Sequence, residues 1–399
     1  MVESRFQLGV GTLAGRMKKP SEKHRNRLVK RNIAHRIGLI YRKKRGGHPR
    51  SASLERGRYL DNWIKSKAEA GELNASINRK GQVTIRLPEV MNFSSDYEIT
   101  AIHINAIRKL APQVRLSPRS LTLALVNFDS LKSISTSAAL VLTAELYKWN
   151  DHLRQRLLPR VGNWHPEIFS RFYQLGFFEL FRKTAEVETM AQEAGGPDAV
   201  RLVKYIKGKT GDTSKTRFLK QEIVNIIGDS ISKWVILNSG FSEAITNVSQ
   251  HAYPESEGFN QAHKNWYLSG GYHPQNRELK FVFYDQGIGI PNSLPSSEIW
   301  EKVVEFLSFL PAMEKRHDAM LLKAAVEIER TSTKESDRGK GLQDLLEFIN
   351  ERKQGYLSIL SQHGLYKYTM VDGRSKVKSE SFKYPIEGTL IIWRVSLID

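Results

Sequence analysis

A glutamate, an asparagine and a histidine stand four residues apart in the stretch SEAITNVSQHAYPES, residues 242–256. Four residues advance an α-helix by about 400°, so Glu243, Asn247 and His251 should lie along one helix face. The apolar residues that face the other way, towards a core, would be Phe241, Ala244, Ile245 and Val248. Such a stripe can be a plain solvated face. Asparagine is a poor helix former, however, and its mid-helix position favours a binding role for the amide.

A glycine-rich turn follows a predicted strand further along the chain. In LKFVFYDQGIGIP, residues 279–291, apolar side chains alternate as in a strand, and Asp285 stands at its end before Gly287 and Gly289. The glycines allow a tight turn and a close approach to a ligand. The carboxylate can accept a hydrogen bond from an exocyclic amine. The motif by itself is common in loops, so its specificity is low.

A second glycine turn, in TSTKESDRGKGLQDLLEFINE, has Gly339, Lys340 and Gly341 before a helix with an apolar stripe. Free N–H groups and the positive end of the helix dipole would attract an anion, with phosphate as the first choice. An ordinary helix start has the same pattern, and Lys340 could bond a phosphate or point to solvent. A last predicted strand, EGTLIIWRVSL, has Thr389 near its start.

In this order, the four segments resemble the GHKL or Bergerat ATP-binding fold of gyrase, histidine kinases, mismatch-repair ATPases and one class of chaperones. EAITNVSQHAY is similar to the N box of that family, closest to the form in bacterial anti-sigma factors. DQGIGIP is similar to its G1 box, DRGKGL to its G2 box and EGTLIIW to its closing strand. The resemblance covers residues 216–399 and implies an α/β sandwich, with a mixed sheet and helices on one face.

The resemblance implies ATP and Mg²⁺ as cofactors and assigns a role to each matching residue. Glu243 would orient or deprotonate the attacking nucleophile, and Asn247 would hold Mg²⁺ through its side-chain oxygen. His251 would lie near the phosphates or pack at the helix end. Asp285 would bind the adenine amino group with support from Thr389. The glycines would shape the floor beneath the base (Gly287 and Gly289) and the phosphate turn (Gly339 and Gly341), with residues 292–338 as the ATP lid.

Residues 75–185 predict a smaller α/β domain without a catalytic cluster. Strands are expected in GQVTIRLPEV and SLTLALVNF, a capped helix in SISTSAALVLTAELYKWNDHL, and an amphipathic helix, interrupted at Gly176, in HPEIFSRFYQLGFFELF. The strand–turn–helix is similar to that of STAS domains, the anti-anti-sigma fold, in which a serine of an Asp-Ser-Ser-Gly turn accepts phosphate. The turn here lacks the aspartate and the glycine, which argues against Ser137 as a phosphate acceptor. Residues 186–215 resemble a linker.

Most of the positive charge lies in one segment, a basic N-terminal arm over residues 1–60. Residues 1–58 carry 17 Lys and Arg against three Glu, whereas the other 341 residues carry 44 basic and 39 acidic residues. Such a cation density attracts nucleic acid, with contacts to phosphates rather than to base edges. An anionic membrane surface, an acidic protein or a solubilising tail are the alternatives.

The composition excludes several classes of function. The chain has no cysteine, which excludes disulfides and thiolate catalysis, and its histidines lack the spacing of a transition-metal site. We found no apolar run long enough to span a bilayer and no secretion signal, so we expect a cytoplasmic protein without membrane contacts.

Three functions fit this sequence. The first is an ATPase that uses its nucleotide state to switch contacts with a protein or nucleic-acid partner. The second is a serine/threonine kinase of the anti-sigma type, and the third is a nucleotide-gated nucleic-acid-binding module without turnover. The identity of the protein partner and the formation of a homodimer stay open.

Overall fold

The computed structural model describes most of the chain from residue 49 onward. The described ranges are 49–113, 120–149, 153–154, 157, 160–181, 187–190, 200–227, 234–308, 317–332, 346–347 and 349–397. Almost all of the basic arm lies outside them, as do Gly339, Lys340 and Gly341. Residues 54–399 form one compact unit, so the middle and C-terminal regions pack together and are not separate bodies.

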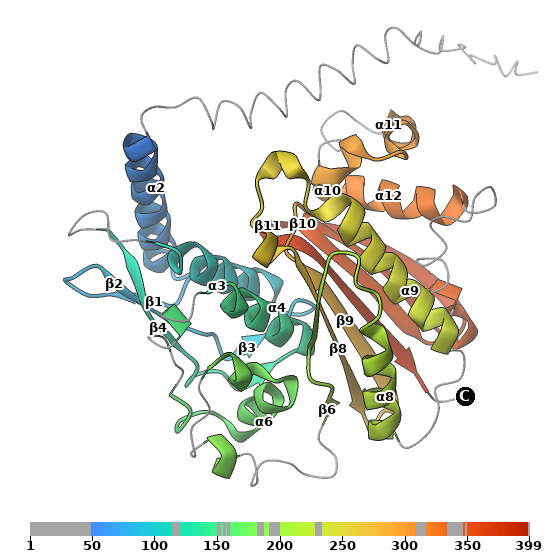
Figure 1. The fold of residues 1–399 in the computed structure, drawn as a ribbon, viewed down its shortest axis with the longest axis horizontal. Helices are drawn as coiled ribbons and strands as arrows, with labels where there is room; N and C mark the ends of the chain where they lie inside the picture. The colour runs from blue at the N-terminus through green and yellow to red at the C-terminus, as the bar shows by residue number, and fades with distance from the viewer. Residues whose placement is uncertain are drawn as a thin grey trace, which may run out of the picture. The chain divides into compact units, whose positions relative to one another are not determined.

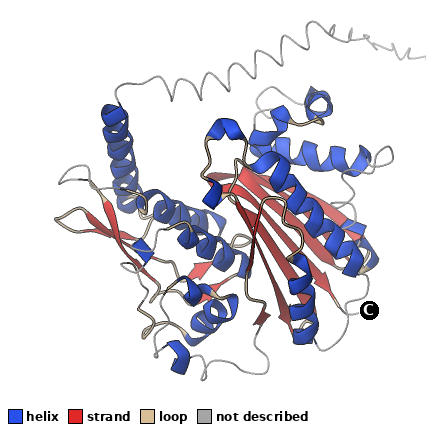
Figure 2. Ribbon diagram, in the orientation of Figure 1, coloured by secondary structure: helices blue, strands red, loops and turns tan. Residues whose placement is uncertain are grey.

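The middle region alternates short strands with helices, as expected for residues 75–185 (Figure 2). Its elements are α2 (Pro49–Glu69), β1 (Ala75–Ile77), β2 (Gln82–Arg86), β3 (Val90–Met91), α3 (Tyr97–Leu110), β4 (Thr122–Asn127), β5 (Ser133–Ile134), α4 (Thr136–Tyr147), α6 (Pro166–Leu175) and a 3₁₀ turn at Phe177–Leu180. Strands β1, β2 and β4 form one sheet with β2 and β4 parallel, and β3 pairs in parallel with β5. The α/β character is therefore confirmed.

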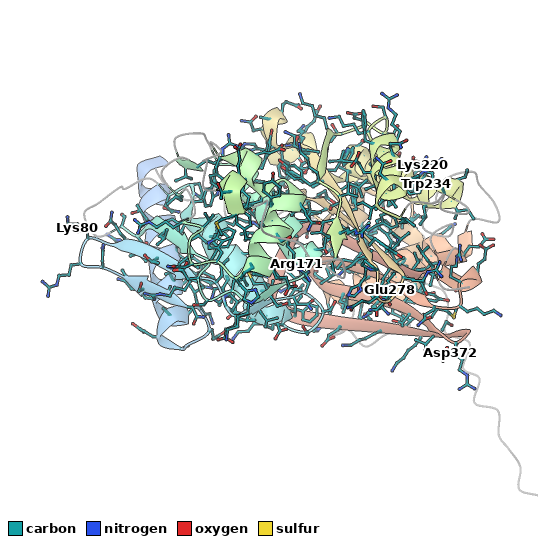
Figure 3. All side chains as sticks on the ribbon, turned by 90° about the horizontal axis from the view of Figure 1, so that it is seen from below. Lys80, Arg171, Lys220, Trp234, Glu278 and Asp372 are labelled. Carbon is teal, nitrogen blue, oxygen red and sulfur yellow. The ribbon has the colours of Figure 1, made fainter. Side chains whose placement is uncertain are left out.

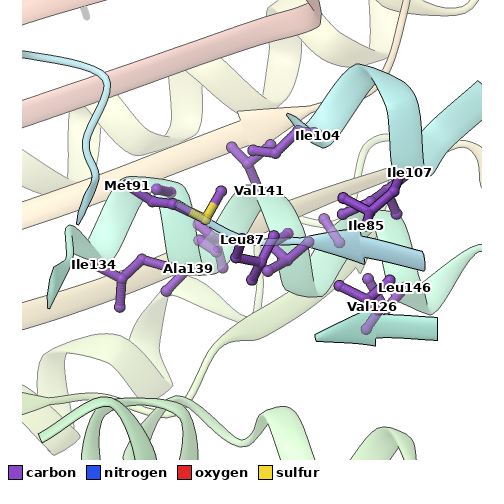
Figure 4. Packing of buried hydrophobic residues seen from close by; sticks show 14 of the residues in the cluster. Ile85, Leu87, Met91, Ile104, Ile107, Val126, Ile134, Ala139, Val141 and Leu146 are labelled. Carbon is purple, nitrogen blue, oxygen red and sulfur yellow. The ribbon is translucent and has the colours of Figure 1, made fainter. Parts of the chain in front are cut away.

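Helix α4 lies at the centre of this region. The Oγ of Ser135 caps it by accepting a hydrogen bond from the Ala138 N–H at 3.2 Å, which confirms the predicted capped helix. Every residue from Thr136 to Leu146 is buried, so neighbours surround the helix on all sides. Side chains of α3 and α4 gather with those of β2 and β4 in one apolar cluster, which includes Ile85, Ile104, Val126 and Val141 (Figure 4).

Helix α6 ends where its sequence requires it to end. Pro166 occupies the first turn, where no intrahelical N–H is needed. Gly176 follows the last turn with a φ of 87°, a left-handed conformation that glycine adopts without a Cβ penalty. The predicted interruption at Gly176 is therefore confirmed, and the chain continues as the 3₁₀ turn.

The C-terminal region is built around one six-stranded sheet (Figure 1). Its longer elements are β6 (Arg201–Leu202), β7 (Ile206–Lys209), α8 (Thr216–Ile227), α9 (Trp234–Asn247), β8 (Asn265–His273), β9 (Glu278–Asp285), α10 (Ile290–Ser293), α11 (Trp300–Ser308), α12 (Asp318–Ser332), β10 (Gly355–Val371) and β11 (Arg374–Ser396). The strand order is β10-β11-β9-β8-β6, and β7 also pairs with β8.

All pairings of this sheet among the described strands are antiparallel, whereas we expected a mixed sheet. Short connections account for two of these pairings, β8 with β9 and β10 with β11. Such connections join antiparallel neighbours, while parallel strands require a crossover of a dozen or more residues.

Both faces of the sheet are covered. On one face, Phe281 and Phe283 of β9 pack in a core with α8 and α9, the layer that carries Lys220 and Trp234 in Figure 3. On the other face, Val282 and Tyr284 belong to the core of the middle region. There α4 contacts β8 and β9, and α3 contacts β11. The C-terminal region therefore places its helices α8, α9 and α12 on one face of the sheet, as expected, and the middle region covers the second face.

The prediction of a linker over residues 186–215 was wrong in its second half. Residues 201–202 and 206–209 are strands β6 and β7, which pair with β8. Their sequences lack a clear apolar alternation, and Gly208 has no room for a side chain because a Cβ would lie 2.0 Å from the Trp266 ring. The pairing of β6 and β7 with β8 therefore depends on the free edge of β8 and on this close packing more than on the residue types of β6 and β7.

The described part of residues 292–338 contains the helices α11 and α12. Helices α11 and α12 share a small core of their own, made of Leu294, Val303, Leu307, Leu321, Ala324, Ala325 and Ile328. This core is distinct from the two cores that flank the sheet.

Candidate nucleotide site

Asp285 is the last residue of β9 and is 3% exposed. Its Oδ1 accepts a hydrogen bond from the Gly287 N–H at 2.9 Å. The hydroxyl and the backbone N–H of Thr389 also donate to this carboxylate, because Thr389 stands directly opposite Asp285 in the pairing of β9 with β11. The predicted neighbourhood of these two residues is therefore confirmed.

Burial raises the pKa of Asp285 from its ordinary 3.8 to about 7, and the bonds from Gly287 and Thr389 only partly offset this effect. A carboxylate that is costly to ionise at neutral pH is unusual in a protein core. Perturbed groups of this kind cluster at functional sites, although structural sites also contain them.

This raised pKa gives the first testable prediction. Between about pH 4 and 7 the folded protein retains a proton that the unfolded chain has released, so Asp285 lowers the free energy of unfolding as the pH rises through this range. Asp285→Asn lacks this dependence. We expect the stability of the variant relative to wild type to increase from pH 5 to 7 and to level off above pH 7. Between pH 5 and 8 this increase is on the order of 2–3 kcal/mol, since each pH unit below the folded pKa contributes about 1.4 kcal/mol. Urea unfolding of both proteins from pH 5 to 8 measures it, and a constant difference would contradict the burial argument.

The glycines of the turn are required by close contacts. A Cβ on Gly287 would lie 2.2 Å from the carbonyl oxygen of Ala252, which also accepts the Ile288 N–H at 2.8 Å. Gly289 has a φ of 79°, and a Cβ there would lie 2.7 Å from the Oγ of Ser361. The turn therefore lies against the end of the helical segment that carries the polar stripe.

Helix α9 carries Glu243 and Asn247, and both are half-buried. The predicted inner face is confirmed, since Phe241, Ala244, Ile245 and Val248 are buried. Glu243 and Asn247 are one helical turn apart, so they share a face as expected. Tyr253, just after this segment, donates its hydroxyl to the Asn265 carbonyl and accepts the Gln286 N–H, which links the segment to β8 and β9.

His251 lies outside the α-helix that carries Glu243 and Asn247, in contrast to the prediction of one continuous α-helix. The α-helix ends at Asn247, and Val248–Ala252 forms a π-helical turn. Burial lowers the pKa of His251, and the nearby Glu298 carboxylate partly offsets this effect. The structure thus places His251 beside the segment over residues 292–338.

The structure brings three of the four predicted segments together: the polar helix, the turn after Asp285 and the strand with Thr389. The fourth, with Gly339, Lys340 and Gly341, lies outside the described residues. Sequence reasoning missed Ser361, which accepts the Ile290 N–H at 2.9 Å and donates to the Gly388 carbonyl at 2.8 Å. No local pattern marks this serine, because its partners come from two distant segments.

Ser137 is a poor candidate for phosphorylation in this structure. It is 1% exposed, and its Oγ lies 3.1 Å from that of Ser135, the residue that caps α4. A phosphate there would have to enter the core between α4 and its neighbours.

No helix among the described residues is long and apolar enough to cross a bilayer. Within the same residues, no three His, Asp or Glu side chains are grouped as a metal site. A Mg²⁺ ion at Asn247 would therefore take its other ligands from phosphates and water, the usual arrangement for this ion.

Comparison of the chain with protein-family models, curated proteins and solved structures gave no match in any of the three.

Proposed function

We propose that residues 216–399 bind ATP with Mg²⁺ and hydrolyse it. The observation that carries the proposal is the buried Asp285 carboxylate at a strand end, oriented by the Gly287 N–H and by Thr389. A group of this kind is suited to accept a hydrogen bond from the amino group of adenine. Gly287 and Gly289 let the turn pack closely against Ala252 and Ser361, which fixes the backbone beside this carboxylate.

The chemistry would depend on the half-buried face of α9. Glu243 would orient or deprotonate the attacking water, and Asn247 would hold Mg²⁺ bound to phosphate oxygens. Phosphoryl transfer depends mainly on positioning and charge neutralisation, which these two residues and the ion would supply. The nucleotide state would then change contacts with a protein or nucleic-acid partner, the latter through the basic arm.

Asp285→Asn tests the nucleotide site directly. Asparagine keeps the size of the side chain but has a single acceptor oxygen, which cannot serve Gly287, Thr389 and adenine together. Hydrogen bonds to charged groups contribute about 1.5–3 kcal/mol, so we expect affinity for both ATP and ADP to fall by about tenfold to hundredfold. Calorimetric titration measures this change. Asp129→Asn, at an exposed turn of the middle region, is the matched control. Wild-type affinity in Asp285→Asn would contradict the proposed nucleotide site.

A further inference from the structure

Gln286 points away from the proposed nucleotide site and into the middle region. Its neighbour Asp285 faces the turn and Thr389, whereas the Nε2 of Gln286 donates to the Oε1 of Glu145 at 2.6 Å. Gln286 is 3% exposed, and its backbone N–H is bound by the Tyr253 hydroxyl at 3.0 Å. The residue next to the proposed adenine ligand is therefore held by bonds on both sides of the sheet.

Glu145 is a buried charge near the C-terminal end of α4, with 2% exposure. Burial alone would raise its pKa, but the charges of Arg108 and Lys148 and the bonds from Arg108 and Gln286 hold the pKa at about 2. Its Oε1 accepts from the Nη2 of Arg108 at 2.7 Å, in addition to the bond from Gln286. Glu145 therefore stays ionised and joins α3, α4 and the strand end of β9.

Arg108 extends the same network to β11. Its Nη2 donates to the Tyr284 hydroxyl at 3.2 Å, and its Nε lies 3.4 Å from the Oε2 of Glu387. The Tyr284 hydroxyl in turn donates to the Glu387 carbonyl at 3.1 Å. Glu387 precedes Thr389 by two residues, so both strands of the proposed site are attached to the middle region. We name Arg108, Glu145, Tyr284, Gln286 and Glu387 the buried bridge.

A stability role alone explains the buried bridge poorly. Apolar side chains of similar size commonly stabilise a core as well as a buried ion pair does, because ionised groups lose their hydration. Elsewhere the interface combines apolar packing, with Tyr267, Val282 and Leu390 in the shared core, with single hydrogen bonds between α3 and β11. The buried ion pair of Arg108 and Glu145 lies beside the strand ends that carry Asp285 and Thr389, through Gln286 and Glu387. The charge of Lys148, the residue after α4, also lowers the pKa of Asp285.

We propose that Glu145 and Gln286 are positioning residues for the nucleotide site, and that through them the docking of α4 controls nucleotide affinity. This inference rests on the proposed function. By thermodynamic reciprocity, nucleotide binding would tighten the docking of α4 by the same factor that docking tightens nucleotide binding. Nucleotide binding would then change the docking of the middle region through the turn after Asp285, without an external partner.

Gln286→Ala is the first test, because it removes the bridge to the turn and leaves Glu145 paired with Arg108. We expect ATP affinity to fall by about fivefold or more, the lower end of measured coupling between sites. The exchange variant Glu145→Gln with Gln286→Glu keeps one donor and one acceptor across the contact and should recover part of the loss. Gln174→Ala is the matched control. Gln174 joins α6 to the edge strand β6 by accepting the Leu202 N–H at 2.7 Å. The variant Gln174→Ala should therefore lose stability without losing ATP affinity.

A second measurement requires no nucleotide. Hydrogen exchange of the backbone amides at residues 286–290 should accelerate in Gln286→Ala and Glu145→Gln, and should stay at the wild-type rate in Gln174→Ala. Unchanged exchange in the first two variants, or equal acceleration in all three, would overturn the positioning role. If wild type binds no ATP, the proposed function fails while the exchange data still decide whether the bridge positions the turn. If ATP binds and Gln286→Ala has wild-type affinity, the control of affinity by α4 is wrong.

Discussion

Glu243→Ala should bind ATP with Mg²⁺ normally and turn it over at least about 10²-fold more slowly, the usual loss when a general base is removed. The reason is that ATP binding would depend on Asp285 and the phosphate contacts, whereas Glu243 would act only on the nucleophile. Single-turnover hydrolysis and calorimetry on the same samples separate the two effects. Glu222→Ala, at an exposed position of the neighbouring helix α8, is the control and should hydrolyse ATP at the wild-type rate.

Two further measurements complete this test. Asn247→Ala should lose the Mg²⁺-dependent part of ATP binding, which Glu243→Ala retains. Labelled γ-phosphate distinguishes an ATPase, which releases free phosphate, from a protein kinase, which leaves label on protein. Wild-type turnover in Glu243→Ala would show that this glutamate is not the base.

The basic arm should bind nucleic acid with little dependence on sequence and with a steep dependence on salt. If six cations contact phosphates on duplex DNA, affinity should fall by about three decades between about 50 and 200 mM salt. Deleting residues 1–48 should abolish this binding and leave ATP affinity unchanged. This segment contains 14 Lys and Arg against two Glu. It also stops before α2, whose Leu60 and Ile64 are buried in the core.

Anisotropy titrations of labelled duplex and single strands at several salt concentrations test the arm, with full-length and shortened protein side by side. Equal affinity of the two proteins would place the nucleic-acid site elsewhere. The absence of binding at low salt would leave the arm as a protein-docking or solubilising segment.

Local patterns predicted much of the fold. The residue pattern identified the strands β2, β4 and β9 and the capped helix α4, and Gly176 marked the end of α6. The pairing of Asp285 with Thr389, 104 residues later, followed from the resemblance and was confirmed by the register of β9 and β11. Each of these features depends on residues close in sequence or on a motif with its own geometry.

The parts that sequence reasoning missed depend on distant partners. Strands β6 and β7 pair only because β8 offers an edge, and their own residues look like a polar linker. The π-turn at Val248–Ala252 replaces an expected α-helix, at a point where the Ala252 carbonyl bonds to Ile288. The buried bridge joins Arg108 and Glu145 to Gln286 across more than 140 residues, and each of these looks like an ordinary surface residue in its own segment.

The shared core has a consequence for the biosynthesis of this protein. The Tyr97 hydroxyl of α3 donates to the Tyr384 carbonyl, and the Asn105 amide donates to the Pro385 carbonyl, both at 2.9 Å. These partners are synthesised about 280 residues later, which corresponds to about 15–60 s at ribosomal rates of about 5–20 residues per second. During that interval the apolar face of α3 and α4 lacks its covering sheet. Nascent chains of this protein are therefore expected to depend on chaperones until the last strand leaves the ribosome.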